Sequence, residues 1–243
     1  MNTLSIFKRE LKSYFSHPIA YAIIIVFVVL SLGFTFTFGR FMRVGDASLE
    51  WPFFFWHPWI YMLLAPAVGM RMWADEQRNG TIELLGTFPL STRSAILGKY
   101  HAGNTVWALA LALTFPIWIT TKYLGSPDHG MILSGYLGSF LLCATFLAIT
   151  MLVSAFTRDQ VVCLIVSTFI CTMMVITSYD DILQEAGKVL SEGVIELIAS
   201  MGVWDHFRSA MRGSIRLLDI VWHVSLIGAC LLSTSAILSA KRA

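Results

Sequence analysis

The sequence predicts an all-α integral membrane protein with six transmembrane helices. Only 13% of its 243 residues are charged, whereas a typical soluble domain has about 25%. Uncharged stretches of about 20 residues, the length needed to cross a bilayer core as a helix, recur along the chain. These stretches are continuously apolar and lack the alternation of barrel strands. We therefore expect one transmembrane domain over residues 1–243, with no separate soluble domain.

Composition and charge exclude two other classes of protein. Hydrophobic residues make up 56% of the chain, which is far too much for an intrinsically disordered protein. The formal net charge is only +2, and a nucleic-acid-binding domain needs clustered basic residues and a higher pI. The sequence therefore predicts no nucleic-acid partner.

The segment before the first span predicts a short N-terminal amphipathic helix in the membrane interface. Its apolar stripe and the basic residues beside it are Leu4, Phe7, Leu11 and Tyr14 or Phe15, and Lys8, Arg9 and Lys12. Basic residues favour the cytoplasmic leaflet, which is rich in anionic headgroups. The alternative is a frayed, solvated tail.

The six expected spans cover residues 18–39, 51–70, 103–121, 131–157, 160–179 and 220–240. No small-residue cleavage site accompanies the first span, so we interpret it as a retained helix. The tryptophans at the start of the second span are typical of an interfacial aromatic belt. Lys and Arg are more frequent in the segments that lie on the same side of the membrane as the N-terminus than in those on the other side. This difference predicts that both termini are cytoplasmic.

Residues 71–102, between the second and third spans, predict a short cytoplasmic helix that needs a partner. Gly80 is expected to end the extension of the second helix, and Thr81 to cap a new one. Pro89 ends the new helix within about two turns, and Ser91 caps the helix that follows. The short helix contains Ile82, Leu84, Leu85 and Phe88 together with Glu83 and Thr87. Because it cannot bury these apolar residues alone, we expect it to bind a groove on a partner. The alternative is a loop packed on its own helix ends.

The loop between the fifth and sixth spans, residues 180–216, predicts short outer helices. Its first half has apolar residues at helical steps, which indicates a segment on the outer surface or folded back between the spans. Arg208, Arg212 and Arg216 step by four and are expected on one face of a second short helix. Lipid-facing or salt-bridged positions are favoured for them over contact with an anionic substrate.

Residue patterns for catalysis or metal binding are absent from the sequence. No Gly-Lys pair belongs to a phosphate-binding G-x-x-x-x-G-K-[ST] loop, so the chain is not expected to hydrolyse ATP or to bind a cofactor directly. All four cysteines fall in the spans without close pairing, and buried packing explains them. His57 and His223 lie near the starts of spans, where their rings are expected to reach the headgroups.

Three segments together resemble the ABC-2 type transporter permeases. The loop after the second span resembles the family motif E-x-x-x-G-T-x-E-L-L-x-T-x-P, which is followed here by Gly98-Lys99. The residues that match this motif are Glu76, Gly80, Thr81, Glu83, Leu84, Leu85, Thr87 and Pro89. Residues 9–21 look like the helix that leads into the first span of such permeases.

The third segment points to one subgroup of the family. Residues 205–219 are similar to the H-F-x-x-x-x-R-G-x-I-x-x-x-D of the subgroup with gliding-motility and nitrous-oxide-reductase-maturation permeases. The matching residues are His206, Phe207, Arg212, Gly213 and Asp219. In this family, the outer helices cap the translocation path.

The resemblance implies a permease subunit of an ATP-driven ABC exporter in the bacterial inner membrane. Two permease subunits, as a homodimer or a paralogous heterodimer, would form the path among membrane lipids. A separate cytoplasmic ABC ATPase would carry ATP and Mg and dock on the short helix. The residues implied in this coupling are Glu76, Gly80, Thr81, Ile82, Glu83, Leu84, Leu85, Thr87, Phe88 and Pro89. Pro66 and Pro116 interrupt backbone hydrogen bonding and are candidate hinge points.

An ion-coupled secondary transporter, or another multi-span protein without an ATPase, is the alternative from another class. Such a transporter would need ionisable residues near the bilayer midplane and repeated halves. The middles of the expected spans carry no charge, and residues 1–121 and 122–243 show no convincing repeat. A membrane-embedded enzyme would need a cluster of His, Asp or Glu in the spans. No polar cluster there specifies a substrate.

Overall fold

The computed structural model describes residues 3–39, 41–44, 48–80, 91–188 and 191–241. In these ranges the regular structure is helical throughout, which confirms the predicted all-α class. The elements are α1 (Thr3–Ser16), α2 (Pro18–Thr37), α3 (Phe41–Val44), the 3₁₀ turn η1 (Phe54–Trp56), α4 (His57–Gly69), α5 (Arg71–Arg78), α7 (Thr92–Ala112), α8 (Pro116–Leu124), α9 (His129–Phe156), α10 (Gln160–Ile176), α11 (Asp180–Gly187), α12 (Glu192–Ser200), α13 (Val203–Met211) and α14 (Leu217–Ala240).

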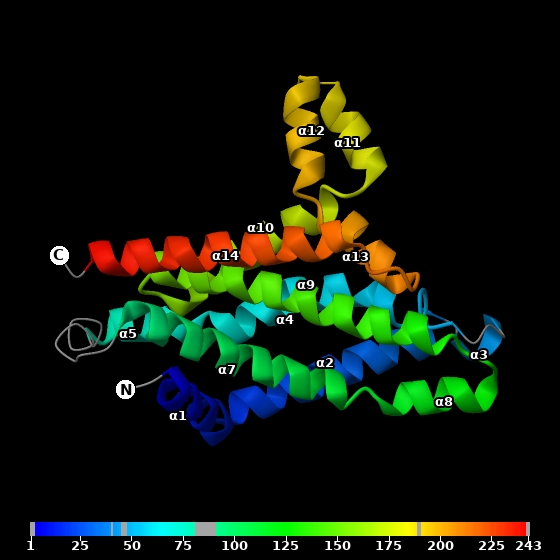
Figure 1. The fold of residues 1–243 in the computed structure, drawn as a ribbon, viewed down its shortest axis with the longest axis horizontal. Helices are drawn as coiled ribbons and strands as arrows, with labels where there is room; N and C mark the ends of the chain where they lie inside the picture. The colour runs from blue at the N-terminus through cyan, green and yellow to red at the C-terminus, as the bar shows by residue number, and fades with distance from the viewer. Residues whose placement is uncertain (1–2, 40, 45–47, 81–90, 189–190, 242–243) are drawn as a thin grey trace.

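The long helices form a bundle with two distinct ends (Figure 1). The helices α1 and α5 and the last turns of α14 lie at one end, whereas α3, α8 and α13 lie toward the other. The hairpin of α11 and α12 stands off the side of the bundle. The bundle therefore brings the first and last helices of the chain to the end that also holds the start of α7.

Within the described ranges, four helical stretches are long and apolar enough to cross a bilayer. They are α2, α7 together with α8, α9 and α14. Helix α10 is apolar but has only 17 residues, and at 1.5 Å per residue it rises about 25 Å against a core of about 30 Å. The expected second span is divided between η1 and α4. Each of the six expected spans thus coincides with helical structure, and the helices at four of them are long enough to cross a bilayer.

Helix α9 occupies the middle of the bundle and packs against α4, α7, α13 and α14. Two of its glycines allow this close approach. A Cβ atom at Gly135 would lie 2.4 Å from Cε2 of Phe54, and one at Gly138 would lie 2.4 Å from Cβ of Ala210. Small residues at such positions let neighbouring helices pack closely in a membrane.

The helix that leads into the third expected span begins at Thr92, eleven residues before the start of that span at Gly103. Ser91 Oγ accepts a hydrogen bond from Ser94 N at 3.2 Å, which confirms the predicted cap. The earlier start places Lys99 inside a helical stretch that is a candidate span. Lys99 interrupts the uncharged stretch in the sequence, but in the structure other helices supply partners for its charge.

The end of α5 agrees with the prediction for the start of the cytoplasmic loop. Helix α5 ends at Arg78, and Gly80 has a φ of 68°, a left-handed conformation that glycine adopts easily. The predicted short helix from Thr81 to Pro89 lies outside the described residues.

Two breaks in the bundle lie near the candidate hinge prolines. Pro116 begins α8 after a turn that ends α7, and Pro66 lies four residues before the junction of α4 and α5. At that junction, Ser154 Oγ accepts from the backbone N–H groups of Trp73 and Ala74 at 2.9 and 3.0 Å. It thereby satisfies amide groups that lack a partner at a helix start.

Helix α1 forms where the amphipathic pattern predicts it, but only part of the predicted stripe contacts the bundle: Tyr14 and Phe15 pack against the core, whereas Leu4 does not. Ile6 is 1% exposed, whereas Leu4 is 61% exposed. Ile6 packs against α7, where a Cβ atom at Gly98 would lie 2.8 Å from Ile6 Cγ2. The hydrophobic stripe does not distinguish a face that meets protein from one that meets lipid.

Candidate functional site

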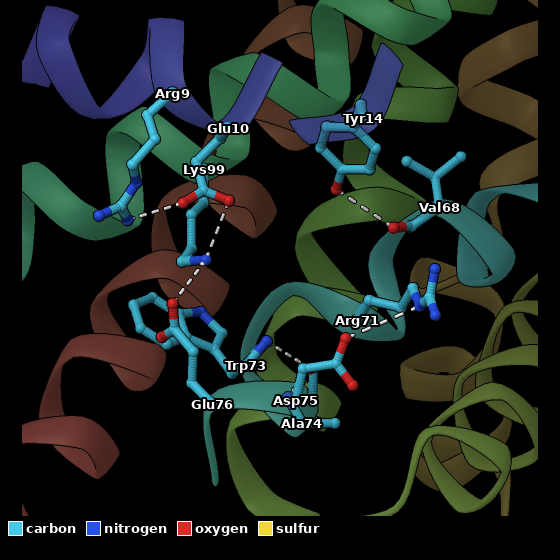
Figure 2. A network of polar contacts seen from close by, with 11 residues as sticks. Arg9, Glu10, Tyr14, Val68, Arg71, Trp73, Ala74, Asp75, Glu76 and Lys99 are labelled. Atoms are coloured by element: carbon cyan, nitrogen blue, oxygen red, sulfur yellow. Dashed lines mark hydrogen bonds and ion pairs between the residues drawn. The ribbon is translucent and has the colours of Figure 1, made fainter. Parts of the chain in front are cut away.

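A buried cation connects three helices at the end of the bundle that holds α1 and α5. Lys99 of α7 is only 5% exposed. Its Nζ lies 3.1 Å from Glu10 Oε2 of α1 and 2.9 Å from Glu76 Oε1 of α5 (Figure 2). Burying a charge is costly unless it is paired, and two carboxylates surround this one. We call Glu10, Glu76 and Lys99 the Lys99 triad.

Further contacts support the triad on both sides. Lys99 Nζ lies 5.3 Å from the ring centroid of the buried Trp73, within cation–π range. Arg9 Nη2 donates to Glu10 Oε1 at 2.8 Å. Burial opposes ionisation of Glu10, but the charges and hydrogen bonds of Lys99 and Arg9 outweigh it and lower the pKa of Glu10 below its ordinary value. Glu10 is therefore a carboxylate at neutral pH.

The opposite side of α5 is anchored to α9 and to the C-terminal end of α14. Gln77 Nε2 donates to the carbonyl oxygens of Ser154 and Ala155 at 2.9 and 3.0 Å. Lys241 Nζ donates to the same Ala155 oxygen at 2.8 Å and also to Gln77 Oε1. Adjacent side chains of α5 thus connect it to the triad on one side and to α9 on the other.

The triad spans the predicted coupling loop, because α5 precedes that loop and α7 follows it. Of the ten residues implied in coupling, the structure describes Glu76 and Gly80. The other eight, Thr81, Ile82, Glu83, Leu84, Leu85, Thr87, Phe88 and Pro89, lie outside the described residues. The sequence motif found Glu76 but did not assign it a partner, and Glu10 was not predicted to take part. The feature of the sequence that indicates a buried ion pair here is the position of Lys99 at the edge of a long apolar stretch.

The five residues of the outer-loop motif meet at the junction of α13 and α14. His206 Nδ1 lies 2.9 Å from Asp219 Oδ1, and the ring of His206 stacks on Trp222 with centroids 4.4 Å apart. Ser209 Oγ donates to the other oxygen of Asp219. The remaining motif residues hold the turn: Phe207 is fully buried, Gly213 has a φ of 86° and Arg212 Nε donates to Glu50 Oε1 at 3.0 Å.

The three arginines of the outer loop do not share one helix face. Helix α13 ends at Met211, so only Arg208 is helical, while Arg216 is the N-cap residue of α14. The expected ion pairing is confirmed for Arg208, which lies 4.0 Å from Asp205, and for Arg212 with Glu50. The four-residue spacing of the arginines predicted one continuous helix, but the helix ends at Met211, just before the turn at Gly213.

The prediction that His57 and His223 reach the headgroups is wrong. Both rings are buried, and their Nδ1 atoms lie 2.7 Å from Ser139 Oγ and 2.8 Å from Thr145 Oγ1, respectively. Both partners belong to α9, so the histidines contribute to packing around the central helix.

The four cysteines are buried free thiols, in agreement with a packing role. In the part of the chain that the structure describes, no group of three His, Cys, Asp or Glu residues is placed to hold a metal ion.

Comparison with known proteins gives one family. The model of the ABC-2 family transporter protein matches residues 4–201, from α1 to the turn after α12. No curated protein matches the chain. The match includes all three residues of the Lys99 triad and the whole predicted coupling loop, whereas the outer-loop motif lies beyond it. The bundle of apolar helices and a family match over most of its length lead to one conclusion: the chain belongs to the ABC-2 family of transporter proteins and is a membrane permease component of an ABC transporter.

Proposed function

We propose that this chain is the six-span permease subunit of an exporter, and that force from a separate ATPase enters it through the loop between α5 and α7. The Lys99 triad is the observation that carries this proposal. Because Lys99 Nζ contacts Glu10 and Glu76 at 3.1 and 2.9 Å, the helices before and after the loop are held to α1. A displacement of the loop would then move α1, α5 and α7 together.

In this proposal, the segment Thr81–Pro89 docks on a cytoplasmic ABC ATPase that binds ATP and Mg. The segment combines apolar residues with Glu83 and Thr87, as expected of a short helix that binds in a groove. ATP-driven closure of the ATPase pair would displace the segment and then α5. Pro66 and Pro116, which lie near helix breaks, are where the long helices would bend.

The remaining parts of the proposal concern assembly and orientation. Two permease subunits, identical or paralogous, would line the path, in the inner membrane of a bacterium with both termini in the cytoplasm. The shared position of α1, α5 and the end of α14 at one end of the bundle supports this orientation (Figure 1). The contacts among His206, Ser209 and Asp219 support a structural role for the motif that is similar to the gliding-motility and nitrous-oxide-reductase-maturation subgroup.

The experiment that tests the coupling role is co-purification with the cognate ATPase. Glu83→Arg reverses a charge in the proposed docking segment and should weaken binding and ATPase stimulation several-fold or more. Glu192→Arg makes the same change on the exposed helix α12 and should leave both unchanged. Undiminished binding and stimulation with Glu83→Arg would show that the segment is not the docking site.

A further inference from the structure

A cavity of about 510 Å³ opens between α1, α2, α4 and α5, beside the Lys99 triad. This volume is in the range of about 300–1,000 Å³ that is typical of small-molecule sites. Its lining is divided into a polar part, mainly from α1, α5 and the start of α7, and an apolar part from α2, α4 and a later turn of α7. The charged residues of the polar part are Arg9, Glu10, Arg71, Asp75, Glu76 and Lys99.

The apolar part of the cavity reaches the outer surface of the bundle at Ile19. Ile19 lines the cavity and is 37% exposed. Helix α2 is a candidate membrane span, so the exposed side of Ile19 would meet acyl chains. The cavity therefore has a polar end near the surface helix α1 and an apolar end open to lipid, which fits an amphiphile better than a water-soluble ligand.

The charges in the cavity balance, and most are already engaged. Its three cations, Arg9, Arg71 and Lys99, face the carboxylates of Glu10, Asp75 and Glu76. Lys99 and Arg9 contact the glutamates as described above. A cavity with no formal net charge favours a ligand that carries both signs over one that is only anionic.

Arg71 is the cation of the cavity that has a hydrogen-bond donor left over for a ligand. Its Nε is buried and makes no hydrogen bond to any residue that the structure describes, and it lies 3.7 Å from Asp75 Oδ2. In Figure 2, its guanidinium group lies on the side of Asp75 away from the Lys99 triad. A guanidinium group presents a planar fork of donors that matches a phosphate. Arg71 is thus suited to bind a phosphate. The Asp75 carboxylate next to it accepts a hydrogen bond from Gln160 Nε2 at Oδ1, and its remaining acceptor capacity is available for an ammonium group.

The first turn of α2 adds a weaker attraction for the same group. Ile19 and Ala20 of this turn line the cavity, and no side chain caps the start of the helix. Uncapped amides at a helix N-terminus carry a partial positive charge. The phosphate would therefore lie between this helix start and Arg71.

We propose that this cavity binds the headgroup of a membrane glycerophospholipid that carries a phosphodiester and a primary ammonium. The phosphate contacts Arg71, the ammonium contacts Asp75, and the acyl chains leave the cavity past Ile19 of α2. The bound lipid fills the space between α1 and α5. The site stands on the cavity and its charges, and it is independent of any ATPase.

The test is native mass spectrometry of the delipidated, purified full chain with defined lipids. Phosphatidylethanolamine should be retained more strongly than phosphatidylglycerol with the same acyl chains. Arg71→Gln should weaken retention of phosphatidylethanolamine roughly tenfold or more, because a charge-assisted hydrogen bond is lost. Arg78→Gln removes an exposed arginine from the same helix, outside the cavity lining, and should leave retention unchanged.

Three outcomes would overturn the proposal. Equal retention by Arg71→Gln and Arg78→Gln would show that the lipid binds elsewhere. Equal retention of phosphatidylglycerol would rule out recognition of the ammonium group. Full displacement by water-soluble glycerophosphoethanolamine at the same concentration would identify a soluble ligand rather than a lipid.

A second variant keeps the test decisive if Arg71→Gln does not fold. Ala67→Phe fills the apolar part of the cavity while Arg71 remains in place. We expect the same loss of phosphatidylethanolamine, and retention as in the wild type would contradict the proposed path of the acyl chains.

Discussion

Lys99 shows what a single buried charge requires of its neighbours. Its charge lies two turns into α7, in a helical stretch that is otherwise apolar enough to cross a membrane. Glu10 and Glu76 provide the compensating charges from two helices, α1 and α5, that both precede α7 in the sequence. Removing one partner of such a buried pair is far more destabilising than removing a surface pair, because an unpaired charge remains.

We therefore predict that Lys99→Met destabilises the protein strongly, by about 3–5 kcal/mol. The substitution removes the cation that lies between two carboxylates, so the repulsion between Glu10 and Glu76 is no longer offset. Lys188→Met is the matched control, because Lys188 is exposed and forms a surface pair with Glu185. The measurement is thermal unfolding of the purified variants in one detergent. Equal melting temperatures for the two variants would contradict a structural role of the triad.

At the scale of elements, α9 determines how closely its neighbours pack. In the apolar stretch of α9, 78% of the residues are buried, whereas the corresponding shares are 33% in α2 and 17% in α14. The glycines of α9 permit contact with η1 and α13, and its serines and threonines form hydrogen bonds with α4, α5 and α14. Interhelical contacts of this kind replace the hydrophobic driving force that is absent between helices in lipid.

Gly138→Ala tests this packing. The added Cβ would lie 2.4 Å from Cβ of Ala210, so α13 must shift, and we expect a loss of about 1–3 kcal/mol. Gly33→Ala in α2 is the control, because nothing lies within 4 Å of its added Cβ. Alanine is the better helix former, so this control should be neutral or slightly stabilising. Thermal unfolding that ranks the two variants in the opposite order would show that α9 and α13 are not in close contact.

At the scale of the whole molecule, the two ends of the bundle hold different features. One end holds the Lys99 triad, the anchoring of α5 and the cavity that we propose to bind lipid. The other holds α8 and the junction of α13 with α14, where the outer-loop motif is joined to Glu50 before η1 (Figure 1). If the first end is cytoplasmic, the ATPase-coupling loop and the proposed lipid site lie in the same leaflet, where anionic and amino phospholipids are accessible from the inside.

Labelling with a membrane-impermeant thiol reagent tests this orientation. Ser5→Cys on α1 and Tyr123→Cys on α8 place exposed thiols at opposite ends of the bundle, and all four native cysteines are buried. On intact spheroplasts we expect Tyr123→Cys to react and Ser5→Cys to be protected. Inverted vesicles should give the reverse pattern. Reaction of both from the same side would contradict the proposed crossing of the membrane.

The sequence by itself determined the class of the protein and the places where its helices lie. Long uncharged stretches can satisfy their backbone in lipid only as helices, so composition and length were sufficient to predict them. Local signals also placed the cap at Ser91 and the end of α5 before Gly80, because these depend on residues within one turn.

Only the tertiary structure decided which side of each helix meets protein, and which charges meet one another. Lys99 and Glu10 are 89 residues apart in the sequence, and no local pattern relates them. The same applies to Ile6, which packs on α7 in place of Leu4, and to His57, which bonds to Ser139 rather than reaching the headgroups. Apolar residues are equally stable against lipid and against another helix, so hydropathy places a helix in the membrane while packing and paired polar groups set its neighbours.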